Sequence, residues 1–180
     1  RLPPRSFRFG EVSFVLCLYS SKGGVGCSVA AAVLALQSAD RTPTLLVDLR
    51  GDLEVILGVV PSVDGLGEWF RLDEPSPDLL HRLEVVVRPG LSVLPRGSLR
   101  SPARPDRYRL LARLLRAEHR QVVVDVGTHA VPATAVLAEA ASTALGTRAC
   151  YLALDAARNG PMPDQVVLIE EEGRALGSRD

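Results

Sequence analysis

The stretch Ser21-Lys22-Gly23-Gly24-Val25-Gly26-Cys27-Ser28 decides the fold, because it places a glycine-rich loop between two regular segments. An apolar run typical of a buried strand, Val12 to Tyr19, precedes it, and an alanine-rich helical pattern, Ser28 to Ser38, follows it. In a strand–loop–helix unit of this kind, the loop amides and the positive end of the helix converge and favour an anion. Lys22 is the single lysine of the chain, whose other basic residues are all arginine. The sequence therefore predicts a phosphate-binding loop.

The loop departs from an ordinary phosphate loop at Cys27, where the pattern G-x-x-x-x-G-K-[ST] has a lysine. A cation about 3–4 Å from a phosphate contributes roughly 4 kcal/mol at an effective dielectric constant of 20, so its loss weakens binding about a thousandfold. Three interpretations stay open. Either the site has decayed and only the fold remains, or a nucleotide still binds weakly through Lys22, the loop amides and Ser28. The third is a redox role, because a helix N-terminus lowers the pKa of a thiol and makes it reactive.

The chain has 180 residues and no net charge, since 21 basic side chains balance 21 acidic ones. Its length fits one domain, and the neutral balance gives no global field that would draw it to nucleic acid or membrane. We expect a flexible arm over residues 1–10 and a single domain over residues 11–180. We find no transmembrane segment, and Cys17, Cys27 and Cys150 have no metal-ligand spacing, so we expect a cytoplasmic protein.

Apolar runs and helical patterns alternate along the chain, as in a mostly parallel sheet flanked by helices. The strands that we expect are Val12–Tyr19, Thr44–Asp48, Val85–Val87, Leu91–Leu94, Gln121–Asp125, Leu145–Cys150 and Gln165–Ile169. The helices that we expect are Ser28–Ser38, Asp52–Gly58, Asp64–Phe70, Asp106–His119, Pro132–Ser142 and Tyr151–Ala157, the fourth with Asp106 as its N-cap. The predicted fold class is therefore α/β, with three layers.

Three charged residues fall at or just beyond the ends of predicted strands. Lys22 follows the first strand, Asp48 ends the second, and Asp125 ends the strand that begins at Gln121. Because ligands of parallel sheets bind at the carboxyl ends of the strands, we expect these three side chains at one edge of the sheet. A purely structural role for either carboxylate, and a helix-capping role for Ser28, stay open as alternatives.

Four segments together resemble the deviant Walker A group of P-loop ATPases that contains ParA and MinD. The segment from Lys22 to Ser28 is similar to the K-G-G-V-G-K-[ST] loop of that group, and six of seven positions match. The other three segments, in the right order and spacing, are Leu45-Leu46-Val47-Asp48, Gly90-Leu91-Ser92-Val93-Leu94-Pro95 and Val122-Val123-Val124-Asp125. The resemblance covers roughly residues 12–170. It implies a P-loop fold of the ParA/MinD type and, as cofactors, ATP or ADP with Mg²⁺.

The resemblance also implies a role for each matching residue. Lys22 would reach the phosphates bound to a partner subunit and Asp48 would orient the attacking water, so these two are the candidate catalytic residues. Ser28 would bind Mg²⁺, and Asp125 would hold it indirectly. The implied phosphate-binding residues are Lys22, Gly23, Gly24, Val25, Gly26, Cys27 and Ser28. Members of the group dimerise around two ATP molecules and position chromosomes, division sites, flagella or pili, which implies a homodimer and a protein partner.

Several features of the group are altered in this chain. Besides Cys27, the second strand continues into Asp48-Leu49-Arg50-Gly51-Asp52 in place of D-x-D-P-Q, and Asp125-Val126-Gly127 replaces D-x-P. The last strand and helices usual in the group have no counterpart, which we interpret as a truncation at the C-terminal end. We therefore expect a degenerate ParA/MinD-like pseudo-ATPase that serves as a scaffold or regulator in intracellular positioning. The alternative is an active, dimerising Mg-ATPase, with or without non-specific DNA binding.

A basic segment, residues 100–120, contains seven arginines. Four of them, spaced by 4, 3 and 4 residues, would form one stripe along the predicted helix: Arg109, Arg113, Arg116 and Arg120. Tyr108, Leu111 and Leu115 would form the buried face of that helix. The stripe could contact DNA phosphates with a steep salt dependence, meet a protein partner, or be only a solvated basic face.

A few further residues have a simpler interpretation. Trp69 and Phe70 are expected in the core, with an exposed docking patch as the alternative. Cys17 and Cys150 fall in apolar strand contexts and are expected to be inert. No histidine is assigned a catalytic role, and His129 is the one nearest to the predicted site in sequence.

Overall fold

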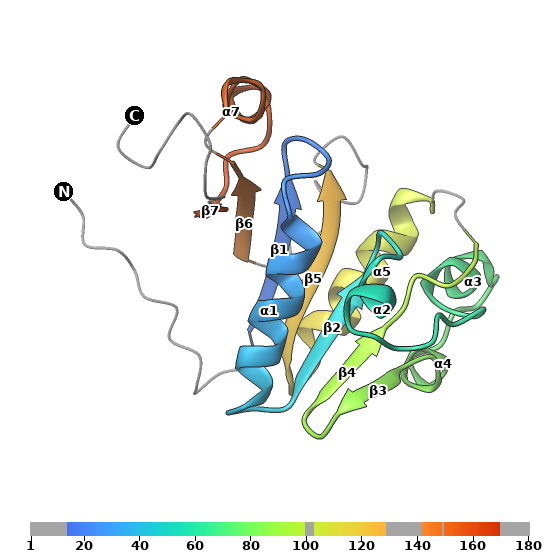
Figure 1. Cartoon of the computed structure of the whole chain (residues 1–180). Coiled ribbons are helices and arrows are strands. Elements are labelled where there is room, and N and C mark those ends of the chain that lie inside the picture. Colours follow the sequence, from blue (N-terminus) through green and yellow to red (C-terminus); the bar gives the residue numbers. More distant parts are fainter. Residues whose placement is uncertain (1–13, 100–102, 129–141, 149, 170–180) are drawn as a thin grey trace.

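A computed structural model of the chain describes residues 14–99, 103–128, 142–148 and 150–169. Its strands are β1 (Val15–Ser20), β2 (Thr44–Asp48), β3 (Val85–Arg88), β4 (Leu91–Leu94), β5 (Gln121–Thr128), β6 (Ser142–Thr147) and β7 (Gln165–Leu168). Its helices are α1 (Cys27–Ala39), α2 (Leu53–Ile56), α3 (Leu66–Arg71), α4 (Pro77–Arg82), α5 (Pro105–Arg116) and α7 (Tyr151–Arg158). Figure 1 shows one sheet with helices on both sides, so the predicted three-layer α/β fold is confirmed.

The sheet has the strand order β3-β4-β2-β5-β1-β6-β7 and is parallel except at one edge. There β3 pairs with β4 in the antiparallel sense, and Gly90, with φ of 82°, makes the turn between them. The glycine loop leaves the carboxyl end of β1, which lies between β5 and β6. The end of β2 lies level with Asp125 of β5, because Asp48 and Asp125 are direct partners in the parallel register. The sheet therefore brings the predicted carboxylates to the edge from which the loop emerges.

Two apolar cores lie on opposite faces of the sheet, and β1 contributes to both. Leu16 and Leu18 pack with α1 and α2, whereas Cys17 and Tyr19 pack with α3, α4 and α5. This alternation follows from the period of two in a strand, and it explains why β1 is an almost continuous apolar run. On α1 the inward residues are mostly alanines, whose small side chains let the helix backbone approach the sheet closely.

The core that contains residues of α3, α4 and α5 confirms two predictions about buried side chains. Trp69 and Phe70 are buried, and the Trp69 indole N–H donates to the Ser76 carbonyl at 3.0 Å. Burial of large aromatic side chains is among the strongest apolar contributions to a core, and the indole donor is satisfied here. The expected inner face of α5 is also buried, at Tyr108, Leu111 and Leu115.

The structure corrects the predicted helix Asp106–His119. Helix α5 begins at Pro105 with Arg104 at the cap position, so Asp106 is not the N-cap, and it ends at Arg116. Proline at the first helical position explains this start, because its missing N–H would be unpaired there in any case. Arg120 lies four residues beyond the end of the helix and therefore does not belong to the predicted stripe.

Strand β6 was predicted too late in the sequence. It runs from Ser142 to Thr147 rather than from Leu145 to Cys150, and Cys150 instead occupies the cap position of α7, where it is half-buried. Strand β5 extends past Asp125 to Thr128. Helix α4 was not predicted, although Ser76 accepts a hydrogen bond from the Leu79 amide at 3.2 Å and Pro77 begins the helix.

Some predictions fall outside the described residues. These are the arm 1–10, the predicted helix from Pro132 up to the start of β6, and His129. Within the described part of the chain, no helix has the length and apolar character that crossing a bilayer requires.

Candidate functional site

The glycine loop encloses a cavity of about 270 Å³ at the carboxyl end of the sheet. Gly24 and Gly26 adopt φ of 76° and 94°, a left-handed conformation that residues with a Cβ rarely adopt. Two contacts hold the loop in place: the Ser21 hydroxyl donates to the Ala153 carbonyl at 2.9 Å, and Arg148 Nε donates to the Val25 carbonyl at 3.0 Å. The cavity is lined by Ser20, Gly23, Gly24, Val25, Gly26, Cys27, Ser28, Val29, Arg50, Asp52, Gly127 and Thr128.

Cys27 is the first residue of α1, and its side chain is buried at the base of this cavity. Its sulfur lies 3.3 Å from the position that a Cβ on Gly146 of β6 would take. Burial, with a smaller contribution from the nearby Asp125 carboxyl, raises the pKa of the Cys27 thiol to about 12. The thiol is therefore neutral at physiological pH, and the interpretation of Cys27 as a reactive thiolate is wrong. Desolvation outweighs the helix dipole at this position.

Asp125 is fully buried beneath the loop and has unmet hydrogen-bonding capacity. One carboxyl oxygen, Oδ1, accepts from the Gly127 amide at 3.2 Å, whereas Oδ2 has no partner among the described residues. Burial, with a smaller contribution from Asp48 and against a hydrogen bond from Ser28, raises the pKa of Asp125 to about 6. A buried carboxylate with a free oxygen beside a hydroxyl is a favourable position for a cation or its water shell.

Asp48 is buried at the end of β2, and backbone amides occupy both of its oxygens. The Arg50 amide donates to Oδ1 at 2.8 Å, and the Leu53 amide donates to Oδ2 at 2.9 Å; the Gly51 amide also donates to Oδ1. Burial raises the pKa of Asp48, and these three amides oppose the increase. Asp48 thus has a clear structural task, which is to fold the β2–α2 loop back over the sheet edge. Its predicted role in orienting water stays a prediction.

Lys22 lies at the exposed tip of the loop and does not line the cavity. Its ammonium group therefore does not replace, within this subunit, the cation that Cys27 lacks. An outward-pointing lysine is consistent with the expectation that Lys22 acts on a nucleotide held by a second subunit, and this role also stays a prediction.

Comparison with known proteins places this geometry in a fold family. Neither a protein-family model nor a curated protein matches the chain. Among solved structures, a ParA family ATPase from Chlorobium tepidum TLS matches with a TM-score of 0.75 and 20% identity, over 93% of this chain and 78% of that one. The septum site-determining protein MinD from Pyrococcus horikoshii OT3, complexed with Mg-ADP, matches with a TM-score of 0.70 and 16% identity, over 87% and 70%.

The chain has the ParA/MinD-type P-loop fold. At this level of identity the likeness concerns the fold alone. The kinase domain of the Escherichia coli tyrosine kinase ETK also matches, with a TM-score of 0.65 and 19% identity, over 91% of this chain and 71% of that one. The ParA/MinD-type fold therefore accommodates more than one activity, and the function must be argued from the residues of the site.

The residues at the base of the ParA/MinD-type cavity fit a magnesium ion. Mg²⁺ prefers oxygen ligands and keeps several waters. Ser28 lines the cavity, and the buried Asp125 next to it has a free Oδ2. A bound ion would also compensate the negative charges of Asp48 and Asp125, which face each other across the β2–β5 pair. The loop glycines and Ser28 line the cavity, and their predicted role in binding the phosphates of a nucleotide stays a prediction.

Sequence reasoning missed one residue that lines the cavity. Arg50 lines the cavity, and its aliphatic chain lies against Gly127, because a Cβ on Gly127 would come 2.7 Å from Arg50 Cδ. The signal that could have found it is the replacement of an acidic position in the D-x-D-P-Q pattern by an arginine.

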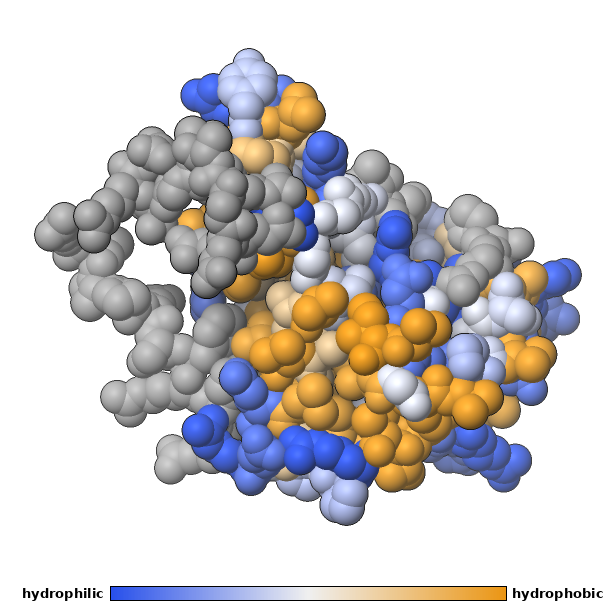
Figure 2. All heavy atoms as spheres, in the orientation of Figure 1, coloured by the Kyte–Doolittle hydropathy of each residue, from blue (hydrophilic) through white to orange (hydrophobic). Residues whose placement is uncertain are grey.

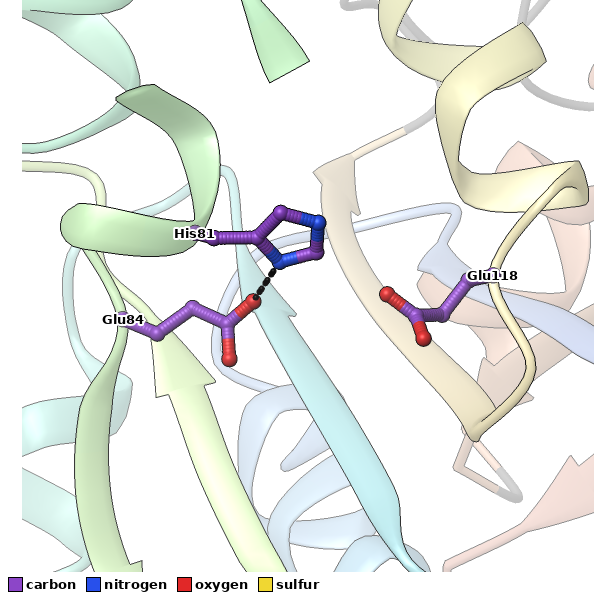
Figure 3. Close-up of side chains that lie close together, drawn as sticks. All are labelled: His81, Glu84 and Glu118. Carbon is purple, nitrogen blue, oxygen red and sulfur yellow. Dashed lines mark hydrogen bonds and ion pairs between the residues drawn. The ribbon is translucent and has the colours of Figure 1, made fainter. Parts of the chain in front are cut away.

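Outside this site, helix α4, the residue before β3 and the segment after α5 bring together His81, Glu84 and Glu118, whose ligand atoms lie within 4.8 Å of one another (Figure 3). His81 Nδ1 is 3.1 Å from Glu84 Oε1. Both carboxylates, however, already accept from the Arg120 guanidinium, at 2.7 and 2.8 Å for Glu84 and 2.8 Å for Glu118. We interpret the cluster as a structural ion-pair network and not as a metal site, since arginine supplies the cation.

Arg109, Arg113 and Arg116 are exposed on α5, so three of the four predicted stripe residues do face solvent from one helix. Arg120 is engaged with Glu84 and Glu118 instead. That the stripe contacts DNA or a protein partner stays a prediction, and the stripe consists of three arginines instead of four.

Proposed function

We propose that this chain is a degenerate ParA/MinD-type protein that binds a nucleotide weakly, does not hydrolyse it at an appreciable rate, and serves as a scaffold or regulator in intracellular positioning. The observation that carries the proposal is the neutral thiol of Cys27 at the place of the loop lysine. Phosphoryl transfer depends on positioning the phosphates and on neutralising their charge, and the loop lacks the lysine that would do both.

The parts of the site that remain support binding. The glycine loop keeps its left-handed turns, and Ser28 with the free Oδ2 of Asp125 would hold Mg²⁺. When bound, the ion would neutralise phosphate charge. The residues of this chain would do the rest: the loop amides would orient the phosphates, and Ser28 would position the ion on the first turn of α1.

A homodimer and a protein partner of a positioning system belong to the same proposal. Figure 2 shows apolar side chains gathered on the face that carries α1 and α2. The exposed apolar residues of these helices and the loop after α2 are Val29, Val33, Val55, Ile56, Val60 and Val63. Contiguous exposed apolar surface of this kind is typical of an interface. Lys22 is also exposed, in the loop that precedes α1. We therefore propose that this face meets a second subunit.

The test of this function is a calorimetric titration of the full chain with ADP and a non-hydrolysable ATP analogue in the presence of Mg²⁺, together with a phosphate-release assay. We expect weak binding and no release above background. Cys27→Lys should then bind both ligands at least tenfold more tightly, and at most about a thousandfold, because it restores the loop cation. Cys27→Ala is the matched control, since it removes the thiol without adding charge, and it should bind like the wild type.

Two outcomes would contradict the proposal. Steady phosphate release by the wild type, abolished in Asp125→Asn, would make the chain an active ATPase. Unchanged affinity in a folded Cys27→Lys variant would mean that the loop no longer forms a phosphate cradle.

A further inference from the structure

We propose that Arg50 supplies, from the loop between β2 and α2, the cation that the glycine loop lacks, and that it binds the terminal phosphates of a nucleoside di- or triphosphate in the same subunit. The inference rests on the nucleotide-binding site proposed above and deepens it. The cavity would thus have a phosphate-binding arginine in place of a phosphate-binding lysine, positioned from the opposite wall.

The backbone of Arg50 is held firmly. Its amide donates to Asp48 Oδ1 at 2.8 Å, two residues after β2 reaches the sheet edge, and the Leu49 amide donates to the Asp125 carbonyl at 3.1 Å. The next amides, at Gly51 and Leu53, bind the same Asp48 carboxylate. Because buried hydrogen bonds fix this turn, the side chain of Arg50 starts from a defined point on the cavity wall.

The side chain then passes over Gly127, which follows Asp125 by two residues. A Cβ at Gly127 would lie 2.7 Å from Arg50 Cδ and 3.1 Å from Cγ, and Gly127 itself has φ of 88°. A glycine at this position therefore leaves the space that the aliphatic part of Arg50 needs. The positive charge also lowers the pKa of Asp125, so the guanidinium lies within electrostatic reach of the carboxylate at the base of the cavity.

The ion pair of Arg50 with Asp52 can yield to a stronger anion. Arg50 Nε lies 3.6 Å from Asp52 Oδ2, and the two side chains are 46% and 56% exposed. An ion pair this long and this exposed is worth little, whereas an arginine and a phosphate form short, charge-assisted and often bidentate hydrogen bonds. Asp52 would keep the guanidinium at the cavity mouth until a phosphate takes its place.

Other cations near the site do not compete for this role. Among the residues that line the cavity, all of them in the described part of the chain, Arg50 is the one lysine or arginine. Lys22 is exposed at the loop tip, and Arg148 Nε donates to the Val25 carbonyl, which stabilises the loop backbone. The arginine at position 50 partly offsets the cysteine at position 27, because a cation is lost from one wall and another is gained elsewhere in the cavity.

The experiment is a calorimetric titration of the full chain with Mg-ADP, Mg-pyrophosphate and AMP. Arg50→Gln should weaken binding of ADP and of pyrophosphate by the same factor, about 10- to 100-fold, because both ligands lose the same charge-assisted contact. AMP, which has no second phosphate, should lose much less. Arg82→Gln, at an exposed arginine that ends α4, is the matched control and should leave all three affinities unchanged. Melting curves of both variants should match the wild type.

A second arm tests the replacement directly. Cys27→Lys should restore ADP binding to the Arg50→Gln variant. The factor by which Cys27→Lys increases ADP affinity should be at least tenfold larger in the Arg50→Gln variant than in the wild type, because the two cations bind the same phosphates. Equal ADP affinity of Arg50→Gln and the wild type would overturn the inference while leaving the proposed function intact. Failure of the wild type to bind ADP at millimolar concentration would overturn the Arg50 inference as well. Phosphate release by the wild type would contradict only the non-hydrolysing function.

Discussion

Single residues decide how much charge this site can neutralise. A lysine at position 27 would contribute a cation on the first turn of α1, but the buried thiol found there stays neutral because burial raises its pKa to about 12. The two carboxyls beneath it, Asp48 and Asp125, have raised pKa values for the same reason. The pocket thus concentrates buried acids without a loop cation, which is an arrangement that a bound metal ion or Arg50 would relieve.

The raised pKa of Asp125 makes the stability of the ligand-free protein depend on pH. In the folded state this pKa is about 6, above the ordinary value of 3.8, so the native state holds its proton longer than the unfolded state. Stability should therefore fall as pH rises from about 4 through 6. Asp125→Asn should abolish part of this fall, and at pH 8 its free energy of unfolding should exceed that of the wild type by on the order of 1–3 kcal/mol.

Melting curves between pH 4 and 8 without Mg²⁺ would check this, with the exposed Asp155→Asn as a control that leaves the profile unchanged. The same Asp125→Asn variant should bind Mg-ADP more weakly, because the oxygen beside Ser28 is lost. An Asp125→Asn profile parallel to the wild type would show that this carboxyl is not the titrating group.

At the scale of elements, the ion-pair network of Arg120, Glu84 and Glu118 joins the segment after α5 to the start of β3. Arg120 donates to Glu84 at 2.7 and 2.8 Å and to Glu118 at 2.8 Å, and its hydrogen bond lowers the pKa of Glu118 to about 2. A depressed carboxyl pKa stabilises the fold above the unfolded value of 4.5, and this contribution is lost as pH falls toward 2.

Arg120→Ala should therefore destabilise the protein at pH 7 by about 1–2 kcal/mol, a modest value because solvent screens the partly exposed network. At pH 3 the loss should be smaller. Urea denaturation at the two pH values measures both, and Arg109→Ala on the exposed face of α5 should change neither. An equal loss at both pH values would indicate that Arg120 acts through packing alone.

The elements that sequence could predict are those whose pattern is local. Strands β1, β2 and β5 are apolar runs buried on both faces, and α5 shows its buried residues at helical spacing, so all four were recognised. The end of α5 was misplaced because no glycine or proline marks it. Beyond the helix end, Arg120 pairs with Glu84, which lies 36 residues away in sequence, and a local pattern does not show such a contact. Helix α4 was missed although Ser76 caps it and Pro77 begins it.

The same distinction applies to the site. The loop, Asp48 and Asp125 were found because each is continuous with its own strand. Arg50 could not be found in this way, since its place in the cavity depends on Asp48 turning the β2–α2 loop toward Gly127. Nor does sequence spacing show that Cys27 is buried against Gly146 of β6, which reverses the expected direction of its pKa shift.

For the whole molecule, the exposed apolar face predicts self-association. Val60 is 84% exposed in the loop after α2, and Val86, at 71%, is equally apolar but lies on β3 at the far edge of the sheet. Val60→Glu should lower the dimer fraction seen by light scattering in the presence of Mg-ADP, because it places a charge within the proposed contact. Val86→Glu is the matched control and should not.

Neither substitution removes a buried side chain, so the melting temperatures should stay within a degree or two of the wild type. If Val86→Glu reduces the dimer fraction and Val60→Glu does not, the contact lies at the β3 edge. A protein that is monomeric under all conditions would contradict the proposed homodimer.

The position of β1 in the middle of the sheet has a consequence for synthesis on the ribosome. β1 leaves the ribosome first, yet both of its neighbours, β5 and β6, begin only at Gln121 and Ser142. β2, β3 and β4 are available much earlier, but β2 also needs β5 to connect it to β1. The centre of the sheet must therefore wait for contacts between distant parts of the chain, which form slowly. A nascent chain that ends before Gly127 lacks one wall of the cavity, so the proposed nucleotide would influence folding only after β5 has been made.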